Sequence, residues 1–429
     1  GQIHLTHFSP DGKNIITIAE DSLVKIWDVL TGHPLAGFNT KSSYSFAEYS
    51  PTGKKIVTAF EDGTAKIWDA STGSFLTNLK GHADKVIFPI NAIAYPKDVD
   101  NESFPFSADG KKMVAVSTDS TCKIWDVFSG HLLTDLKGHP HNVWGAELSP
   151  DGKKVWTILL NDFIKIWDVS TGSLLTILKD SFNINGYTQV GFSPDAKKIV
   201  TISILSDSTA RLWDVSSGIV IAVLKGHAGP IFFARFSPDG KNIMTNSNDG
   251  IVKIWDASTG NLLKNIKAHT GRKRDFAKFS PDGEKIITYS VDSTAKTWAF
   301  SSGNLLAEIN VHALISHAKF SPDGKQIVIN SKNDFTSIWD ATSGNLLANL
   351  PGGSNLSRRY SPDGKKIITG SNGDLKIWDA STFQLLTDLN KNFTAVFNLG
   401  FSPDGEEIFA RTDAGLAILD ASSGKVLTT

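Results

Sequence analysis

Sets of histidine, threonine and aspartate recur along the chain at nearly constant spacing. One set is His227, Thr245 and Asp249. A hydroxyl, an imidazole and a carboxylate are the groups of a hydrolytic triad, in which the imidazole takes the hydroxyl proton. A hydrolase needs one such constellation in one exposed cleft, so the repetition predicts instead a buried polar network within each repeat. Two further sets have the same order: His269, Thr288 and Asp292, and His139, Thr157 and Asp162.

The tryptophans follow the same spacing. Nine of the 11 tryptophans occupy one slot of a segment typified by KIWDASTGNLL at Lys253, and Leu419 fills this slot in a tenth copy. The copies are separated by roughly 40 residues, the period expected for one blade of a β-propeller. The ten predicted units are 1–38, 39–80, 81–137, 138–180, 181–225, 226–267, 268–310, 311–350, 351–389 and 390–429.

Each unit predicts four antiparallel β-strands. It contains Ser-Pro-Asp-Gly or a near copy, which suits a tight turn because Pro fixes φ and Gly accepts φ > 0. Short β-rich runs then follow, such as 285–288, 294–296 and the Leu305-Leu306 pair. One such sheet cannot cover both of its faces, so we expect radial stacking, with the Trp and Leu-Leu side chains packed between neighbours. The prediction is an all-β propeller over 1–429 with ten blades in one ring; the alternative is a seven-bladed ring with three extra blades, which would expose sheet edges.

The Gly-His dipeptide, the Ser-Pro-Asp-Gly turn and the terminal Trp-Asp pair together resemble the WD40 repeat family over essentially the whole chain. The resemblance implies that a His, a Ser or Thr, an Asp and a Trp form a hydrogen-bonded tetrad inside each blade. It therefore adds Trp255, Trp298 and Trp167 to the three sets above. Many family members close their ring by mixing strands from both termini in one blade, and no such overlap is visible here, so the mode of closure stays open.

Two other units match the tetrad only in part. Unit three keeps His82 but has Ala115 in the hydroxyl slot. Unit eight keeps His312, Asp334 and Trp339 but has Ile329 in that slot. We expect blades that lack the full set to be looser.

Composition restricts the class of partner. The chain has 43 Lys+Arg and 44 Asp+Glu, a formal net charge of −1, so it offers no strong field for nucleic acid or an anionic membrane. A single cysteine, Cys122, permits no intrachain disulfide, which favours a reducing, cytoplasmic location. No motif for a cofactor or a metal is visible, and we expect neither.

The units differ most four to six residues before the turn serine, where each inner strand should begin near the mouth of the channel. Aromatic residues and Arg at such places are typical of interface cores. The alternative is that these side chains add packing between neighbouring inner strands. Two insertions, 95–103 and 204–206, are further candidate loops. The candidate partner-binding residues are Trp144, Phe232, Phe233, Arg272 and Phe276.

These patterns favour a non-catalytic scaffold, or the recognition segment of a larger protein, that holds a protein or peptide partner. The alternative is a lectin-like or hydrolytic propeller with its site in the central channel. That alternative needs clustered carboxylates or metal ligands, whereas the inner strands offer only the scattered Asp275 and Glu147. The oligomeric state stays open.

Overall fold

The computed structural model describes most of the 429 residues, with short gaps. The described residues are 3–19, 23–39, 46–59, 64–79, 82, 86–87, 105–117, 119–140, 143–159, 163–179, 188–203, 208–269, 276–331, 335–351, 360–371, 374–389, 396–412 and 415–428. Both predicted insertion loops, 95–103 and 204–206, lie outside these residues.

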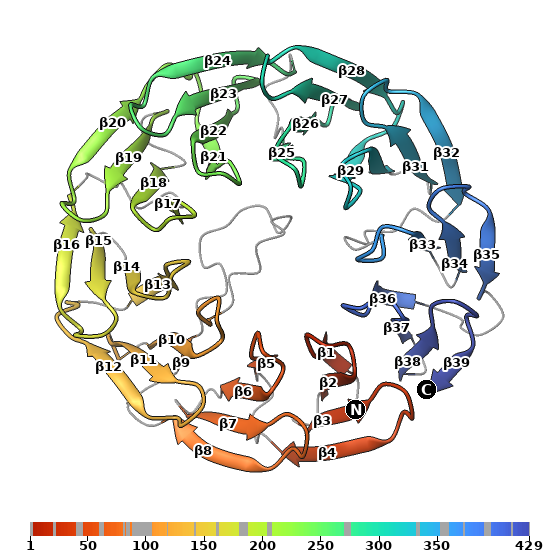
Figure 1. Ribbon diagram of the computed structural model, residues 1–429, viewed down its shortest axis with the longest axis horizontal. Coiled ribbons are helices and arrows are strands. Elements are labelled where there is room, and N and C mark those ends of the chain that lie inside the picture. The colour runs from red at the N-terminus through yellow and green to blue at the C-terminus, as the bar shows by residue number, and fades with distance from the viewer. Residues whose placement is uncertain are drawn as a thin grey trace.

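The described chain forms ten antiparallel sheets and no helix (Figure 1). Nine sheets have four strands, and the sheet of the ninth blade has three described strands plus an isolated bridge between Tyr360 and Ile367 at its inner side. The first five blades contain β1 Ile3–Phe8, β2 Asn14–Ala19, β3 Leu23–Asp28, β4 Pro34–Asn39; β5 Phe46–Tyr49, β6 Lys55–Ala59, β7 Ala65–Asp69, β8 Phe75–Leu79; β9 Val86–Ile87, β10 Lys112–Ser117, β11 Cys122–Asp126, β12 Leu132–Leu136; β13 Val143–Leu148, β14 Lys154–Leu159, β15 Ile164–Asp168, β16 Leu174–Leu178; β17 Thr188–Phe192, β18 Lys198–Ser203, β19 Ala210–Asp214 and β20 Val220–Leu224. The other five contain β21 Ile231–Phe236, β22 Asn242–Ser247, β23 Ile251–Asp256, β24 Leu262–Lys267; β25 Phe276–Phe279, β26 Lys285–Tyr289, β27 Thr294–Ala299, β28 Leu305–Asn310; β29 Ile315–Phe320, β30 Gln326–Ser331, β31 Phe335–Asp340, β32 Leu346–Pro351; β33 Lys366–Ser371, β34 Asp374–Asp379, β35 Leu385–Asp388; β36 Val396–Phe401, β37 Glu407–Thr412, β38 Gly415–Asp420 and β39 Val426–Thr428.

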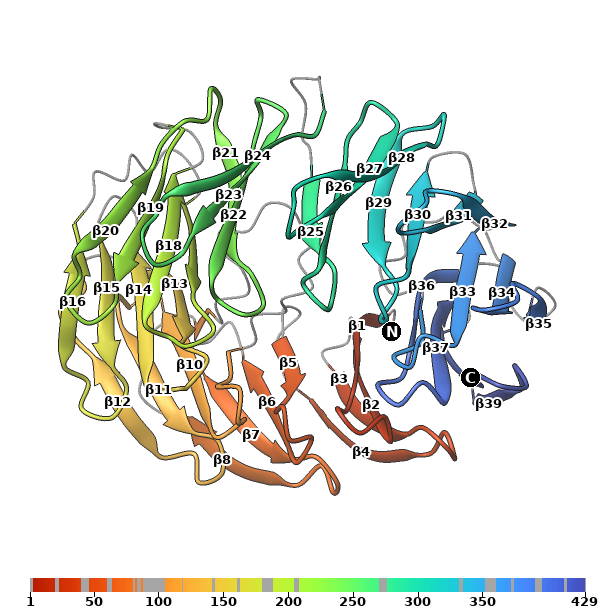
Figure 2. The same cartoon turned by 45° about the horizontal axis from the view of Figure 1, so that its top comes forward.

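The ten blades follow one another around a single ring, and within each blade the strands run outward in chain order (Figures 1 and 2). The ring of ten blades is thus confirmed, and the seven-bladed alternative is wrong. The tenth blade packs directly against the first: Phe8 and Phe409 stack edge to face at 5.5 Å, and Ile15 and Ile418 share one buried cluster. Closure therefore comes from side-chain packing between two blades that each keep their own four strands.

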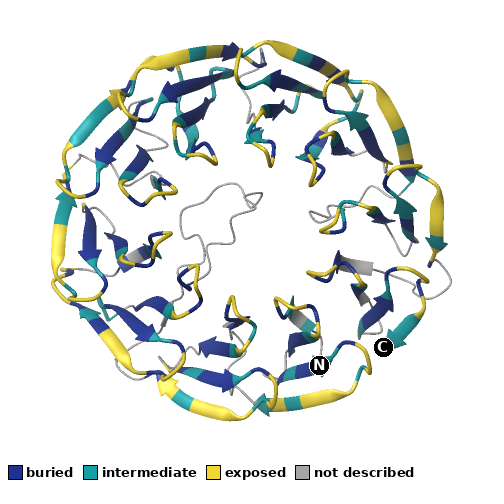
Figure 3. Ribbon diagram, viewed as in Figure 1, coloured by how far each residue is buried: buried dark blue, intermediate teal, exposed yellow. Residues whose placement is uncertain are grey.

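The core lies between neighbouring blades rather than inside any one of them (Figure 3). In the junction of blades five and six, Ile202 and Leu212 of one sheet bury themselves against Phe236 and Ile243 of the next, together with Trp255, which is 3% exposed. Burying a large apolar side chain contributes roughly 1.5–3 kcal/mol. Because each blade has two such junctions, no blade is an independent folding unit.

The Leu-Leu pairs do not pack between blades as predicted. In the outer strands they stand at the rim, with Leu262 44% and Leu263 49% exposed, and the same holds for the pairs at 132–133, 174–175, 346–347 and 385–386. The buried apolar residue of an outer strand is a later one, such as Ile266 at 3% or Leu178 at 0% exposed. Neighbouring sheets move apart with distance from the channel axis. The junction between two blades therefore covers only the residue of the outer strand that lies toward the third strands.

The turn between the first and second strands has one repeated structure. In blade six the Ser237 hydroxyl donates to Asp239 Oδ1 at 2.5 Å and accepts the backbone N–H of Asn242 at 3.0 Å, while Gly240 takes φ +71°. Ala196 occupies the glycine position in blade five and still takes φ +56°, although an L side chain is disfavoured there. A Cβ built on Gly240 would lie 3.1 Å from Pro194 Cδ, so space between successive turns is also tight.

Ala196→Gly is therefore expected to stabilise the protein by about 1 kcal/mol, because it relieves the left-handed backbone of an alanine. Urea denaturation followed by tryptophan fluorescence would measure the change. Gly240→Ala is the matched control and should destabilise by a similar amount. A neutral or destabilising Ala196→Gly would contradict the assigned strain.

Candidate functional site

Four side chains of blade six are joined in one hydrogen-bonded chain. Trp255 Nε1 donates to Thr245 Oγ1 at 2.8 Å, and this hydroxyl lies 2.8 Å from His227 Nε2. The other ring nitrogen, Nδ1, lies 2.9 Å from Asp249 Oδ2, which also accepts the backbone N–H of Ala228. The network assigns the directions: the ionised Asp249 accepts from Nδ1–H, so Nε2 accepts the proton of Thr245.

Two other blades contain the same arrangement. In blade seven, Trp298 donates to Thr288 at 3.0 Å, Thr288 lies 3.2 Å from His269 Nε2, and His269 Nδ1 lies 3.2 Å from Asp292. In blade four, Trp167 donates to Thr157 at 2.8 Å, and Thr157 lies 3.0 Å from His139 Nε2. Asp162, the predicted fourth member, lies outside the described residues.

These hydrogen bonds run as in a serine-protease triad, from the hydroxyl to the imidazole and from the imidazole to the carboxylate. The hydroxyl, however, is not accessible to a substrate. Thr245 is 0% exposed, and its oxygen already accepts the indole N–H of Trp255. Burial lowers the pKa of His227, against the opposing effect of Asp249, so the ring stays neutral near pH 7. A buried hydroxyl with both of its hydrogen-bonding functions engaged stabilises the blade and supplies no nucleophile.

The bond from tryptophan to threonine is more widespread than the complete tetrad. The same indole N–H to hydroxyl bond, at 2.8–3.0 Å, occurs in seven blades. In the pairing of the second strand with the third, each threonine lies opposite the residue two positions before the tryptophan, as Thr245 lies opposite Lys253. The seven pairs are Trp27 with Thr17, Trp68 with Thr58, Trp167 with Thr157, Trp213 with Thr201, Trp255 with Thr245, Trp298 with Thr288 and Trp378 with Thr369.

The two partial units depart from this pattern in different ways. In blade three Ala115 holds the threonine register, opposite Lys123, and the buried Nε2 of His82 has no hydrogen-bond partner among the described residues. The Nδ1 atom of His82 still lies 3.2 Å from Asp119. In blade eight the prediction for His312 is wrong: its side chain is exposed and its backbone takes φ +55°.

Blade eight compensates for the missing hydroxyl locally. Trp339 Nε1 donates to Ser337 Oγ, two residues earlier in the same strand, at 2.7 Å. Ile329 fills the slot of the threonine and is 0% exposed. With no hydroxyl there, His312 lacks the acceptor or donor that would draw it inward, and Asp334 lies outside the described residues.

Three of the predicted partner-binding side chains are half-buried between blades. Phe232 packs on the cluster shared by blades five and six, Phe233 on the cluster shared with blade seven, and Phe276 stacks on Tyr289 at 4.9 Å. Trp144 lies in β13 with its side chain undescribed, and Arg272 lies outside the described residues. These aromatic residues thus contribute to junction packing, and only part of each side chain is exposed.

Glu147 is a carboxyl group of the inner strand β13 with an altered acidity. It accepts a hydrogen bond from Trp156 Nε1 at 3.2 Å and is half-buried. Burial raises the pKa of Glu147 to about 7, and the Trp156 hydrogen bond opposes this rise. Among the described residues no second carboxyl contributes to this shift, whereas a glycosidase site pairs two carboxyl groups.

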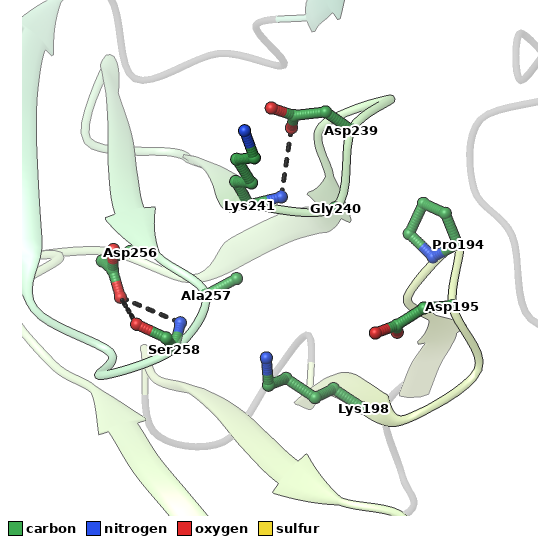
Figure 4. Close-up of a pocket in the computed structure, with 9 residues that line it drawn as sticks. All are labelled: Pro194, Asp195, Lys198, Asp239, Gly240, Lys241, Asp256, Ala257 and Ser258. Atoms are coloured by element: carbon green, nitrogen blue, oxygen red, sulfur yellow. Dashed lines mark hydrogen bonds between the residues drawn. The ribbon is translucent and has the colours of Figure 1, made fainter.

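A pocket of about 660 Å³ opens between the turns of blades five and six (Figure 4). Asp239 and Asp256 both accept hydrogen bonds from their own turns, which lower the pKa of each. Lys198 of blade five has the same register as Lys112 of blade three. Lys112 donates a hydrogen bond to a backbone carbonyl of the next turn, and among the described residues Lys198 makes no such bond. The complete lining is Pro194, Asp195, Lys198, Asp239, Gly240, Lys241, Asp256, Ala257 and Ser258.

A charge pattern that the sequence prediction did not include lies two residues before the turn serine. Blades six to eight carry Arg235, Lys278 and Lys319 there, whereas blades two and four carry Glu48 and Glu147. These charged residues are visible when the units are aligned, but the predicted site residues were taken from the positions four to six residues before the serine.

Thr245→Ala is expected to cost about 1–3 kcal/mol, because it leaves the buried Trp255 and His227 without their shared partner. Chemical denaturation measures this loss. Ala115→Thr is the reverse experiment and should stabilise by about 1 kcal/mol, since the new hydroxyl would reach His82 Nε2. Neutral results for both variants would show that the hydroxyl slot contributes nothing.

Glu147 should also make stability fall as pH rises. Its pKa is raised in the folded protein from 4.5 to about 7, so the neutral form favours folding at low pH and this contribution is lost as pH rises through about 7. Glu147→Gln keeps an acceptor for Trp156. Its free energy of unfolding should rise above that of wild type as the pH increases from 4.5 to about 7, and should stay higher at larger pH values. A stability difference that does not change from pH 4 to pH 8 would contradict the shift.

The chain is similar to a family profile and to a solved structure. No curated protein matched the chain. Among solved structures, the computationally designed Ika8 protein is similar, with 23% identity and a TM-score of 0.46 over 80% of this chain and 95% of that one. In the described residues no helix is long and apolar enough to span a membrane, and no three His, Cys, Asp or Glu side chains gather to hold a metal. The profile "WD domain, G-beta repeat" matches residues 3–28, 29–69, 73–126, 218–256, 260–299 and 345–379, more than half of the chain, and the protein therefore belongs to the WD40 repeat family.

Proposed function

We propose that the chain is a non-catalytic scaffold that holds a protein or peptide partner on its ring. The observation that carries the proposal is that the His, Thr and Asp sets form buried hydrogen-bond networks inside the blades. Their threonines, Thr245, Thr157 and Thr288, are 0% exposed. The residues suited to chemistry thus stabilise the frame. What differs between blades is the lining of the channel.

The inner strands supply the differing surface. The inner strands of successive blades lie around the channel (Figure 1). Partly exposed aromatic residues such as Phe232, together with Trp144 and Arg272, remain the proposed partner contacts. Because Phe233 and Phe276 also pack junctions, their contribution to binding would come through the exposed part alone.

The proposed location is the cytoplasm. The single Cys122 is fully buried, and burial raises the pKa of its thiol far above the usual range, so it is kept as an unreactive thiol. This state suits a reducing compartment, where no disulfide is needed for stability.

The scaffold function predicts loss of a partner without loss of the fold. Tagged wild-type chain, cross-linked in cells and analysed by mass spectrometry, should yield a reproducible partner, which is then purified and titrated. A variant with Trp144→Ala, Phe232→Ala and Arg272→Ala should bind it about tenfold more weakly or worse. Leu263→Ala, on the exposed outer strand, is the matched control and should bind normally.

The alternative function has its own signature. A melting temperature equal to that of wild type must accompany the weaker binding, so that lost contacts are separated from lost structure. Binding to a carbohydrate array, or turnover of a generic ester substrate abolished by Thr245→Ala, would instead favour the lectin-like or hydrolytic propeller.

A further inference from the structure

We propose that a groove on the outer rim of blades two and three binds an extended, uncharged segment of a partner protein, which adds as a further strand to the free edge of β8. Residues 75–78 of β8 and residues 130–132 of blade three line this rim groove, which has a volume of about 410 Å³. The inference rests on the proposed scaffold function and adds a second surface, separate from the inner strands.

Only one of the two edges of β8 is paired. The strand is the last of its sheet and pairs with β7, and among the described residues no strand pairs with its other edge. β8 and β12 follow one another on the outside of the ring (Figure 1). The unpaired backbone N–H and C=O groups of such an edge can form hydrogen bonds with a new strand.

The rim groove follows this free edge rather than one face of the sheet. Successive side chains of a strand point to opposite faces. Leu76, Thr77 and Asn78 are consecutive, and all three line the groove. Blade three forms the other wall, where the turn at Gly130 packs so closely on Thr77 that a Cβ built on the glycine would overlap the threonine Cγ2. An occupant of the groove therefore lies alongside the unpaired backbone of β8.

The apolar side chains of the rim groove are open to solvent. Phe75 is 50%, Leu132 43% and Leu76 41% exposed. The Phe75 ring meets the Trp68 indole edge to face at 5.6 Å, and Trp68 is itself fixed by its hydrogen bond to Thr58. An exposed aromatic ring that is already held in place loses little conformational freedom on binding, as an interface anchor requires.

The charge around the rim groove indicates the chemistry of its occupant. Among the described residues that line it, none is Asp, Glu, Lys or Arg. β8 has the sequence Phe-Leu-Thr-Asn-Leu, whereas the outer strands β24 and β28 carry Lys264 and Glu308. Charged residues on an edge strand discourage pairing with another chain. The groove thus suits an extended segment with apolar and hydroxyl side chains, and its lining offers no ion pair to a polyanion or a charged peptide.

The rim groove is too small for the interface of a stable dimer. A standard protein–protein interface engages about 20–30 residues on each side, whereas the described lining consists of residues 75–78 and 130–132. The rim also curves away on both sides, so two rings placed side by side would touch over few blades (Figure 1). An added strand takes its affinity from backbone hydrogen bonds along one edge, for which this length of edge is sufficient. A partner segment is therefore the occupant that fits, rather than a second copy of the chain.

The first test uses the full chain and a fluorescein-labelled peptide of alternating valine and threonine, with binding followed by fluorescence anisotropy. Wild type should bind this peptide. A peptide of the same sequence with all of its backbone nitrogens methylated should bind about tenfold more weakly or worse, because it cannot donate hydrogen bonds to β8. A peptide of alternating glutamate and threonine should also bind more weakly, because the groove offers its carboxylates no cation.

Variants of the chain locate the binding site. Phe75→Ala with Leu132→Ala removes apolar side chains from both walls and should weaken binding of the valine-threonine peptide about tenfold. Leu263→Ala with Leu347→Ala is the matched control, because these leucines are 49% and 40% exposed on outer strands of other blades, and it should bind as wild type does. If Phe75→Ala lowers the melting temperature, Leu76→Lys tests the same edge by placing a charge on it and should weaken binding in the same way.

Several results would overturn the inference. They are no binding of the valine-threonine peptide by wild type, equal binding of its methylated form, and equal binding by the two double variants when both melt like wild type. Self-association of the chain in sedimentation velocity that Leu76→Lys abolishes would identify a second copy as the occupant and would overturn the inference as well.

The natural partner separates this inference from the scaffold function. If the partner purified by cross-linking binds the Phe75→Ala and Leu132→Ala variant as tightly as it binds wild type, the rim groove is not a partner site and the scaffold function stands. If no partner is found while peptide binding shows the expected dependence on these two residues, the scaffold function fails and the rim groove stands.

Discussion

The hydrogen bond from the tryptophan indole to the threonine hydroxyl is the constraint on which the blades depend. It connects the second and third strands at a position with no exposure to water, as at Thr245. An indole N–H buried without an acceptor would cost free energy, so each of these tryptophans needs an acceptor beside it. Where the hydroxyl is missing, the structure must supply another acceptor, and Ser337 does so for Trp339 in blade eight.

The histidine and aspartate extend this bond but do not create it. Thr201 accepts from Trp213 in blade five, and the corresponding loop of that blade has no Gly-His dipeptide. In blade six, His227 adds a connection from the hydroxyl to the loop that carries Asp249. The complete tetrad therefore ties the top of the first strand to the hairpin between strands two and three. Its absence leaves the blade core intact and removes only that connection.

The sequence predicted the fold well because the repeats specify local structure ten times. The Ser-Pro-Asp-Gly turns, the four strands of each unit and the number of blades all follow from residues close in sequence. Side-chain exposure was harder to predict, since it depends on the distance from the channel axis. Leu262 and Leu263 were expected in the core and stand at the rim. Phe233 and Phe276 were expected at a binding surface and are half-buried in junctions, because inner strands lie close together and leave little open space beside them.

The same geometry explains where a ring of nearly identical blades can become specific. A change in a buried tetrad or junction residue affects two sheets, so those positions are held to the template in most blades. The inner strand has one face toward each neighbour and an edge toward the channel, so long charged side chains can pack their stems at a junction while their ends reach water. Arg235, Lys278 and Lys319 are half-buried at this register, whereas Glu48 is buried beside His7 and burial raises the pKa of Glu147. The residue type at this register can therefore vary from blade to blade while the buried networks of the frame stay the same.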